Sequence, residues 1–424
     1  MQSSWFESTL FYGAVINPRT LRSYDAHPRC LVAVGTRWQH QLAGRGLTAV
    51  ATEHLVELKD WRSSCSLVSS IPIHFTCLRQ HAPQVPNIGT GQQYELLDWL
   101  ANVTFPTEAK FADVAFAKRV YQQVVRGFID AGTTTCCYYA TLHLDASKVL
   151  ADTVHAQGQR GFIGKCNMNH DCPSYYSEPS PEESISATHS IISYIRSLPS
   201  ASSIHAAAGT PQPLNTSEVK YTNELFPDAG SYAGVYDSFG LLREGTILAH
   251  AVHLTPPEVD LIKERNAGIS HCPTSNFNLR SGVAPVGKFL DKGIKVGLGT
   301  DVSGGFSVSI LSEIQHASMA SKVLQFTNAA AIDTTLEGRG RKKHIGSFAP
   351  GKSFDALVVS PSGKQIGMWG SGEKIRSTEE SESPTEKRDL DEWLERFLFC
   401  GDDRNVDRVY VQGRWIGGRS FTGF

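Results

Sequence analysis

The chain has 424 residues, of which 41% are hydrophobic, so it can bury one large core or two moderate ones. Its 40 basic and 42 acidic residues leave a formal net charge of −2, which excludes strong attraction to nucleic acid or an anionic membrane and favours a small neutral substrate. No stretch approaches the roughly 18 consecutive apolar residues of a membrane helix. The nine cysteines lack the spacing of a disulfide framework, so we expect a cytosolic protein in a reducing compartment.

Both ends of the chain carry short strand-like runs. These runs are LFYGAVI (10–16), CLVAVG (30–35), HLVELK (54–59), FDALVVSP (354–361) and RVYVQGRWIGG (408–418). We predict a small composite β domain from residues 1–70 and 345–424, with a second domain, residues 71–344, inserted between them. Residues 362–388 are rich in Ser, Glu, Lys and Gly and predict an exposed loop.

Between the two ends, helical and strand-like segments alternate. Predicted helices cover 117–132, 146–158, 182–198 and 307–324, and predicted strands cover 133–141, 159–167, 246–250, 268–272 and 293–301. One further helix has clear end signals, because Thr255 can cap it, Pro256 can take its first position and Glu258 can complete a capping box. We expect Gly268 to end that helix. Repeated units of this kind predict a parallel sheet, either a closed (β/α) barrel or a doubly wound sheet.

Three residues able to bind metal or move protons lie at or near the ends of successive predicted strands. These are His250, His271 and Asp301, and His81 in HAPQ is a fourth candidate. A single strand-end histidine is more often a structural group, and Asp301 could cap the following helix. Three on successive units instead favour a joint site, because the carboxyl ends of barrel strands face the active site. Imidazoles with one carboxylate suit Zn²⁺, which would activate water for metal-assisted hydrolysis.

Other motifs that bind zinc or carry catalysis are absent from this sequence or have the wrong spacing. CNMNHDC (166–172) holds two cysteines and a histidine, but its spacing matches no common zinc motif, so we interpret it as a solvent loop. The zinc deaminases of the H-x-E and P-C-x-x-C type are excluded because no PCxxC occurs. The chain also lacks GxSxG, a P-loop and a GxGxxG after a strand.

Several stretches together resemble a known family. They are HAPQVPNIGTG (81–91), LLDWLANVTFPTE (96–108), AGTTTCCYYATLH (131–143), SYAGVYDSFGLL (231–242), LAHAVHL (248–254), HCPTSNFNL (271–279), GLGTDVSGG (297–305) and FLFCGDDRNVDRVYVQGR (397–414). In these stretches, and over most of the chain, the sequence resembles the guanine deaminases of the amidohydrolase superfamily, of the fungal type. The combination of HAPQxPNxG with TFPxE points to guanine rather than to another ring.

The resemblance implies a zinc-dependent (β/α)₈ barrel with a composite β-sandwich that hydrolyses guanine to xanthine and ammonia. By match to the family motifs, His81, His250 and Asp301 are metal ligands, Asp301 also handles the water proton, and Gln84 contacts the purine. The resemblance also implies a homodimer.

Two stretches depart from the family pattern. Arg79 stands where the family has the first histidine of an HxH pair, and arginine cannot ligate a metal. The connection 199–217 is too short for the β-α-β passage that would carry a histidine ligand, a proton-shuttling glutamate and an arginine. We therefore expect the barrel to be incomplete around strands 4 and 5. We hypothesise that both stretches come from an altered or mis-joined transcript.

Alternatives to an active guanine deaminase stay open at this point. One is a catalytically impaired or inactive variant that lacks zinc ligands and the shuttling glutamate. The other is an amidohydrolase for a different cyclic amidine, such as a triazine or an adenosine derivative, which the HAPQ and TFPTE stretches disfavour.

Overall fold

The computed structural model describes residues 9–20, 23–35, 38–43, 69–71, 75–199, 204–206, 209–211, 216–327, 355–359 and 384–423. The chain divides into two compact units, one of Met1–His74 with Arg341–Phe424 and one of Phe75–Gly340. Among the described residues, no helix is both long and apolar enough to cross a membrane.

The unit formed by the two chain ends contains one seven-stranded sheet in the order β15-β14-β13-β4-β1-β2-β3. Its elements are β1 (Thr9–Thr20), β2 (Ser23–Gly35), β3 (Trp38–Ala43), β4 (Ser69–Ile71), β13 (Ala356–Val359), α13 (Pro384–Cys400), η6 (Asp403–Asn405), β14 (Val406–Val411) and β15 (Arg414–Gly417). The two ends of the chain join where β4 pairs with β1 on one side and with β13 on the other.

The exposed loop predicted in this unit is partly helical in the structure. Residues 384–388 begin helix α13, so the loop predicted for 362–388 is wrong there; Pro384 fits a first helical turn, and the segment after it is rich in helix formers. Residues 362–383 and the run HLVELK lie outside the described residues.

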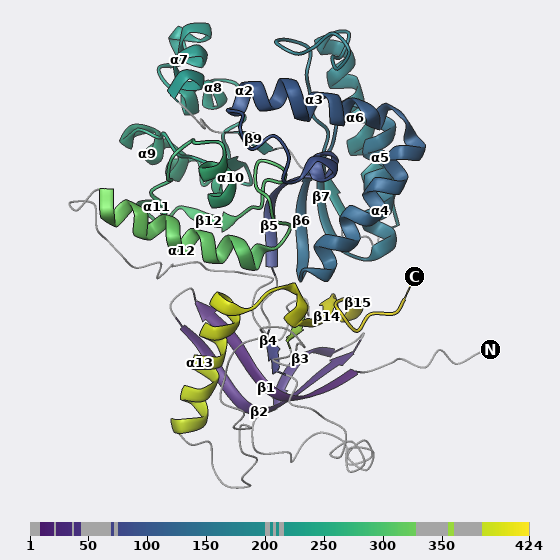
Figure 1. Cartoon of the computed structure of the whole chain (residues 1–424), viewed down its shortest axis with the longest axis vertical. Coiled ribbons are helices and arrows are strands. Elements are labelled where there is room, and N and C mark those ends of the chain that lie inside the picture. Colours follow the sequence, from purple (N-terminus) through teal and green to yellow (C-terminus); the bar gives the residue numbers. More distant parts are fainter. Residues whose placement is uncertain are drawn as a thin grey trace. The chain divides into compact units, whose positions relative to one another are not determined.

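In the other unit, the first half contains a parallel sheet in the order β5-β6-β7-β8. Its elements are β5 (Phe75–His81), η2 (Ala82–Asn87), α2 (Leu96–Trp99), η3 (Leu100–Thr104), α3 (Phe105–Glu108), η4 (Ala109–Ala112), α4 (Val114–Asp130), β6 (Thr133–Tyr139), α5 (Leu144–Gln157), β7 (Arg160–Gly164), α6 (Pro181–Ser197) and β8 (Ile204–Ala206). Helix α4 lies beside β6 and α5 beside β7 (Figure 1), and α6 packs on α5 and β8.

The second half contains a parallel sheet in the order β12-β11-β10-β9. Its elements are β9 (Gly209–Pro211), α7 (Thr216–Leu225), η5 (Pro227–Ala229), α8 (Tyr232–Ser238), β10 (Ile247–Ala249), α9 (Pro256–Glu264), β11 (Gly268–His271), α10 (Pro273–Asn278), α11 (Val286–Asp291), β12 (Lys295–Leu298) and α12 (Ile310–Thr327). The predicted alternation of parallel strands and helices is confirmed.

The end signals of α9 show how closely the sequence determines this half. Thr255 and Glu258 form the predicted capping box, and Pro256 occupies the first position. The predicted stop at Gly268 is wrong, because the helix ends at Glu264 and Gly268 begins β11. Asn266 takes the left-handed conformation instead, with a φ of 55°, which asparagine adopts more readily than most residues.

Beneath α9, an apolar cluster joins that helix to β10, β11 and α11. Its buried members are Leu242, Leu248, Ala251, Val259, Ile262, Ala267, Ile269, Ala284, Phe289 and Ile294. Burial of a large apolar side chain contributes roughly 1.5–3 kcal/mol to folding. This cluster therefore fixes the strands whose carboxyl ends carry His250 and His271.

Strands β5 and β12 approach each other closely where the two parallel sheets meet. A side chain on Gly299 would lie 3.0 Å from both the Cβ and the backbone nitrogen of Arg79, and one on Gly297 would lie 2.4 Å from Leu78. Glycine is therefore needed at both positions of GLG. Past these glycines, the backbone N–H of Asp301 donates to the carbonyl of Arg79 at 3.0 Å, which places the end of β12 against β5.

The connection between β8 and β9 is short. Ile204–Ala206 pairs in parallel with β7, and Gly209–Pro211 pairs in parallel with β10. Two residues, 207 and 208, separate them. Neighbouring parallel strands in one sheet need a crossover of a dozen or more residues. Residues 204–211 are therefore too short to supply two complete parallel strands with a helix between them.

Candidate active site

Asp301 lies at the centre of a buried polar cluster at the carboxyl ends of β5, β10 and β12. Its Oδ1 accepts a hydrogen bond from Nε of Arg79 at 2.7 Å, and its Oδ2 accepts one from Oγ of Ser275 at 2.7 Å. Burial alone would raise the pKa of Asp301, but Arg79 first, and then His250 and His81, hold it well below its usual range. Asp301 is therefore a carboxylate at neutral pH.

The two histidines predicted as ligands face this carboxylate. Nε2 of His81 lies 3.4 Å from Oδ1 of Asp301, and Nε2 of His250 lies 3.5 Å from Oδ2. The ring of His81 stacks on Tyr139 with the centroids 5.1 Å apart. The structure thus brings together all three residues that the sequence marked as a metal set.

His250 is completely buried and held by one neighbour. Its Nδ1 lies 2.9 Å from Oδ1 of Asn276, while its Nε2 has no hydrogen-bond partner among the described residues. Burial lowers the pKa of His250 to about 4, against the opposing effect of Asp301. The ring is therefore neutral at pH 7, and Asn276 orients it toward the carboxylate.

Two members of the cluster have a backbone conformation that is costly for their residue types. His250 has a φ of 66° and Asp301 a φ of 46°. Residues other than glycine occupy this left-handed region uncommonly, and such strained positions concentrate at functional sites. That both occur in one cluster, on separate strand ends, favours a functional role over a structural one.

His271, the remaining strand-end candidate, lies at the end of β11. It is buried, and burial followed by the proximity of the His250 imidazole lowers its pKa to about 4. Its Nδ1 has no hydrogen-bond partner among the described residues. We place it beside the cluster rather than in it.

The zinc implied by the resemblance does not fit these residues as they stand. A metal at Asp301 would have to share the carboxylate with Arg79 and Ser275, which each donate a hydrogen bond to one of its oxygens. The group in closest contact with Oδ1 is a guanidinium, which stays protonated and repels cations. Within the described part of the chain, no three His, Cys, Asp or Glu side chains are grouped so that they could hold a metal ion. We therefore derive no catalytic step through a metal.

Gln84, predicted to contact the purine, lies in a second buried network next to the cluster. Its Nε2 donates to Oε1 of Glu108 at 2.8 Å, and its Oε1 accepts from the backbone N–H of Ser303 at 3.2 Å. Tyr176 donates its hydroxyl to the other oxygen of Glu108. Because Glu108 only accepts when ionised and a backbone N–H only donates, the orientation of the Gln84 amide is fixed.

The sequence prediction did not single out several side chains that shape this site. Glu108, Tyr139, Tyr176, Ser275 and Asn276 all contact a predicted site residue or the network around it. Three of them lie in the family-like stretches TFPTE and HCPTSNFNL, which was the only available signal. Tyr139 lies in a further family-like stretch, AGTTTCCYYATLH (131–143), whereas Tyr176 had no signal, because its contacts join distant parts of the chain.

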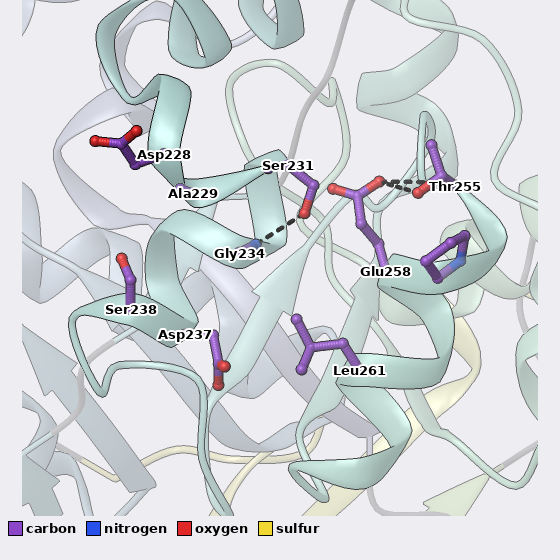
Figure 2. Close-up of a pocket in the computed structure, with 11 residues that line it drawn as sticks. Asp228, Ala229, Ser231, Gly234, Asp237, Ser238, Thr255, Glu258 and Leu261 are labelled. Carbon is purple, nitrogen blue, oxygen red and sulfur yellow. Dashed lines mark hydrogen bonds between the residues drawn. The ribbon is translucent and has the colours of Figure 1, made fainter.

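Two other features do not belong to the site. CNMNHDC (166–172) contains no helix or strand, as predicted for a loop. A pocket of about 520 Å³ lies between α8 and α9 (Figure 2), and none of its lining residues is His81, Gln84, His250 or Asp301. Its Glu258 completes the capping box of α9, and its Asp237 accepts from Arg265 at 2.6 Å. These carboxylates already have structural partners.

Comparison with known proteins gives consistent matches. The model of the Amidohydrolase family matches residues 75–416. A probable guanine deaminase from Schizosaccharomyces pombe is 40% identical over 80% of this chain and 69% of its own length. The guanine deaminase of Dictyostelium discoideum is 38% identical over 96% of this chain and 98% of its own.

Among solved structures, a guanine deaminase from C. acetobutylicum with bound guanine in its active site superposes with a TM-score of 0.81. It is 29% identical and covers 96% of this chain and 100% of its own. The chain therefore belongs to the amidohydrolase family and has its TIM-barrel-like hydrolase fold, and within that family it is a member of the guanine deaminase branch.

Proposed function

We propose that this protein acts on guanine and hydrolyses it to xanthine and ammonia. The observation that carries the proposal is the hydrogen bond between Gln84 and Glu108. It joins the two stretches, HAPQVPN and TFPTE, whose combination distinguishes the guanine deaminases in the sequence. The relatives that bear this activity in their names align with nearly the whole chain, which supports the same substrate here.

We propose Gln84 as the residue that contacts the purine. One N–H of its amide donates to Glu108 and one lone pair of its oxygen accepts from Ser303. A primary amide has a second N–H and a second lone pair, so one donor and one acceptor stay available. The edge of a guanine ring presents complementary acceptors and donors, and a fixed amide can select it because a mismatched ring leaves buried groups unpaired.

For the reaction, we propose that Asp301 exchanges protons with the attacking water. It is ionised and within 3.5 Å of two imidazole nitrogens, so a proton that it takes from water could pass to one of these rings, but the low pKa that Arg79 imposes makes it a weak base. His81, His250 and Asp301 are the residues that would hold zinc in a chain whose carboxylate were not bound by Arg79. In this chain Arg79 does bind the carboxylate of Asp301, so no step of the proposed reaction uses a metal.

We also propose that the barrel of this chain is incomplete in the region of strands 4 and 5. The short passage 204–211 supports this, because its first three residues pair with β7 and its last three with β10. This one short passage therefore pairs with both β7 and β10, each of which would pair with a complete strand in a closed barrel. The composite β-sandwich from residues 1–70 and 345–424, the homodimer and the cytosolic location are retained as parts of the same proposal.

A second candidate function is favoured by the contact between Arg79 and Asp301. It is a chain that keeps the guanine site but turns over little or no guanine. Loss of one proton-transfer group typically costs 10²–10⁴ in rate, and no counterpart of the shuttling glutamate is found in the sequence of the short connection. Such a protein would bind guanine without converting it at an enzymatic rate.

One pair of measurements separates the candidates. Guanine binding is measured at equilibrium with the purified 424-residue chain, and xanthine formation is measured on the same preparation. Binding with turnover supports the deaminase, and binding without turnover supports the impaired form. Preference for adenosine or a triazine over guanine, or no binding of guanine by soluble folded protein, would refute the proposed substrate.

A further inference from the structure

The cluster around Asp301 contains a cation supplied by the chain itself. Arg79 extends from β5, and its side chain is 10% exposed. Its guanidinium carbon lies 5.0 Å from the centre of the Tyr139 ring, on which a cation is stabilised. Its Nε contacts the same carboxylate oxygen, Oδ1, that lies 3.4 Å from His81. The positive charge therefore sits among the side chains that would surround a metal.

We propose that the guanidinium of Arg79 takes the place of a metal ion at Asp301, and that the folded chain therefore excludes zinc from this site. The proposal concerns metal binding alone and does not depend on guanine being the substrate. It assigns Arg79 a role that neither the fold nor the likeness to guanine deaminases provides.

The carboxylate has no oxygen left without a neighbour. Oδ1 accepts from Arg79, and Oδ2 accepts from Ser275, each at 2.7 Å. Each oxygen keeps a further lone pair, but a zinc ion bound to Oδ1 at about 2.0–2.2 Å would lie beside the guanidinium, whose positive charge repels it, so Arg79 would have to move away. Displacing Arg79 would leave a buried guanidinium without its anion, which is strongly unfavourable.

Arg79 stays charged and stays next to Asp301, because its guanidinium keeps its proton and its backbone is held in place. A guanidinium keeps its charge throughout the range in which proteins are folded. Its backbone is held because the carbonyl accepts from the N–H of Asp301 at 3.0 Å and because Gly299 lies directly against it. The cation and the carboxylate are thus fixed to each other through backbone and side chain.

The same geometry indicates which change would admit zinc. The side chains at 79 and 81 lie on the same side of β5, because Nε of Arg79 and Nε2 of His81 both approach Oδ1 of Asp301. Arg79→His would remove the cation and add an imidazole next to His81, His250 and Asp301. Four ligand side chains of this kind suit zinc.

The test is a zinc titration by competition with a chromophoric chelator, run on the unchanged protein, Arg79→His, Arg79→Gln and a control. The control is Arg265→His, which breaks another arginine–aspartate pair, with Nε of Arg265 2.6 Å from Asp237. Changes outside the ligand shell alone alter metal affinity by about 10–100-fold, so Arg79→His should gain at least about 100-fold. Arg79→Gln removes only the cation and should gain less, and Arg265→His should gain nothing.

Each outcome decides the proposal. Tight stoichiometric zinc in the unchanged protein overturns it, whether or not the variants fold. A folded Arg79→His that gains no zinc also overturns it, because Arg79 would then not be what excludes the metal. If Arg79→His does not fold, Arg79→Gln gives the same decision. Zinc content is read without guanine, so failure here and failure of the proposed function are distinguishable.

Discussion

Arg79 and Asp301 form a buried ion pair between the ends of β5 and β12, with 2.7 Å between Nε and Oδ1. The pair links residues 222 positions apart in the sequence. It also occupies the place where two histidines and a carboxylate converge, so it determines what the site can bind.

The first prediction concerns the stability that the ion pair provides. Arg79→Met should lower the free energy of unfolding by about 3–5 kcal/mol, because it leaves the Asp301 carboxylate buried without a counter-charge. Arg265→Met breaks a pair at the surface and should cost much less. Urea denaturation of both variants measures the difference. Equal, small losses would mean that water or another group compensates Asp301.

A second prediction tests the guanine contact. Gln84→Ala should weaken guanine binding roughly tenfold, the effect of losing about one hydrogen bond in a buried site. The matched control is Gln157→Ala on α5, whose amide donates to the carbonyl of Gln122 at 3.0 Å and takes no part in the site. Calorimetric titration with guanine checks both. Unchanged affinity in Gln84→Ala would remove this residue from the binding site.

The support of Gln84 by Glu108 gives a third prediction. Glu108→Gln places an amide where a carboxylate accepted from both Gln84 and Tyr176, so one donor is left facing another donor. We expect a loss of about 1–3 kcal/mol in stability and a weaker affinity for guanine. Glu95→Gln, whose side chain is 73% exposed, is the control. A variant that loses stability while keeping full guanine affinity would show that Glu108 does not position Gln84.

A fourth prediction follows from Glu313 on α12, which accepts hydrogen bonds from the hydroxyl and backbone N–H of Thr274. Burial raises the pKa of Glu313 from 4.5 to about 8. Between these values the folded chain keeps the proton while the unfolded chain releases it. Stability should therefore fall as pH rises through this window, by up to about 1.4 kcal/mol for each pH unit, and level off above it.

The Glu313→Gln variant isolates this effect. An amide does not titrate, so the unfolding free energy of the variant should decline less between about pH 5 and 8 than that of the unchanged protein. Denaturation series at several pH values measure the slopes. Identical slopes in the two proteins would show that Glu313 is ionised in the folded chain.

The fifth prediction addresses the origin of the two unusual stretches. If an altered transcript produced them, messenger RNA from the source should include a fuller form that encodes an HxH pair before HAPQ and a longer segment in place of residues 199–217. Sequencing across both places checks this. Transcripts that encode only the present chain would refute the hypothesis and make Arg79 an inherited feature of the protein.

Much of the fold could be predicted from local signals. The spacing of apolar residues located α4, α5, α6 and β10 to β12, and Thr255 with Glu258 located the start of α9. The meeting of His81, His250 and Asp301 was also predictable, since parallel strands bring their carboxyl ends to one edge. The end of α9 could not be predicted, because asparagine and glycine can both take the left-handed conformation and the choice between Asn266 and Gly268 depends on the path of the chain to β11.

The contacts that decide the chemistry were outside the reach of sequence patterns. The sequence showed that position 79 cannot supply a metal ligand, because it is an arginine. Nothing in the sequence indicated that the guanidinium would bind Asp301 rather than solvent. Likewise, Tyr176 reaches Glu108 from 68 positions away. Such contacts depend on how loops fold over the strand ends, and neither periodicity nor capping signals describe that step.

The most direct test of the account is the zinc content of the unchanged protein, expressed with ample zinc, freed of loosely bound metal by gel filtration and analysed by mass spectrometry. With Arg79 holding Asp301, we predict far less than one zinc per folded chain. One tightly bound zinc per chain would contradict the account, because Arg79 would then have to lie away from the carboxylate and leave it free for the metal.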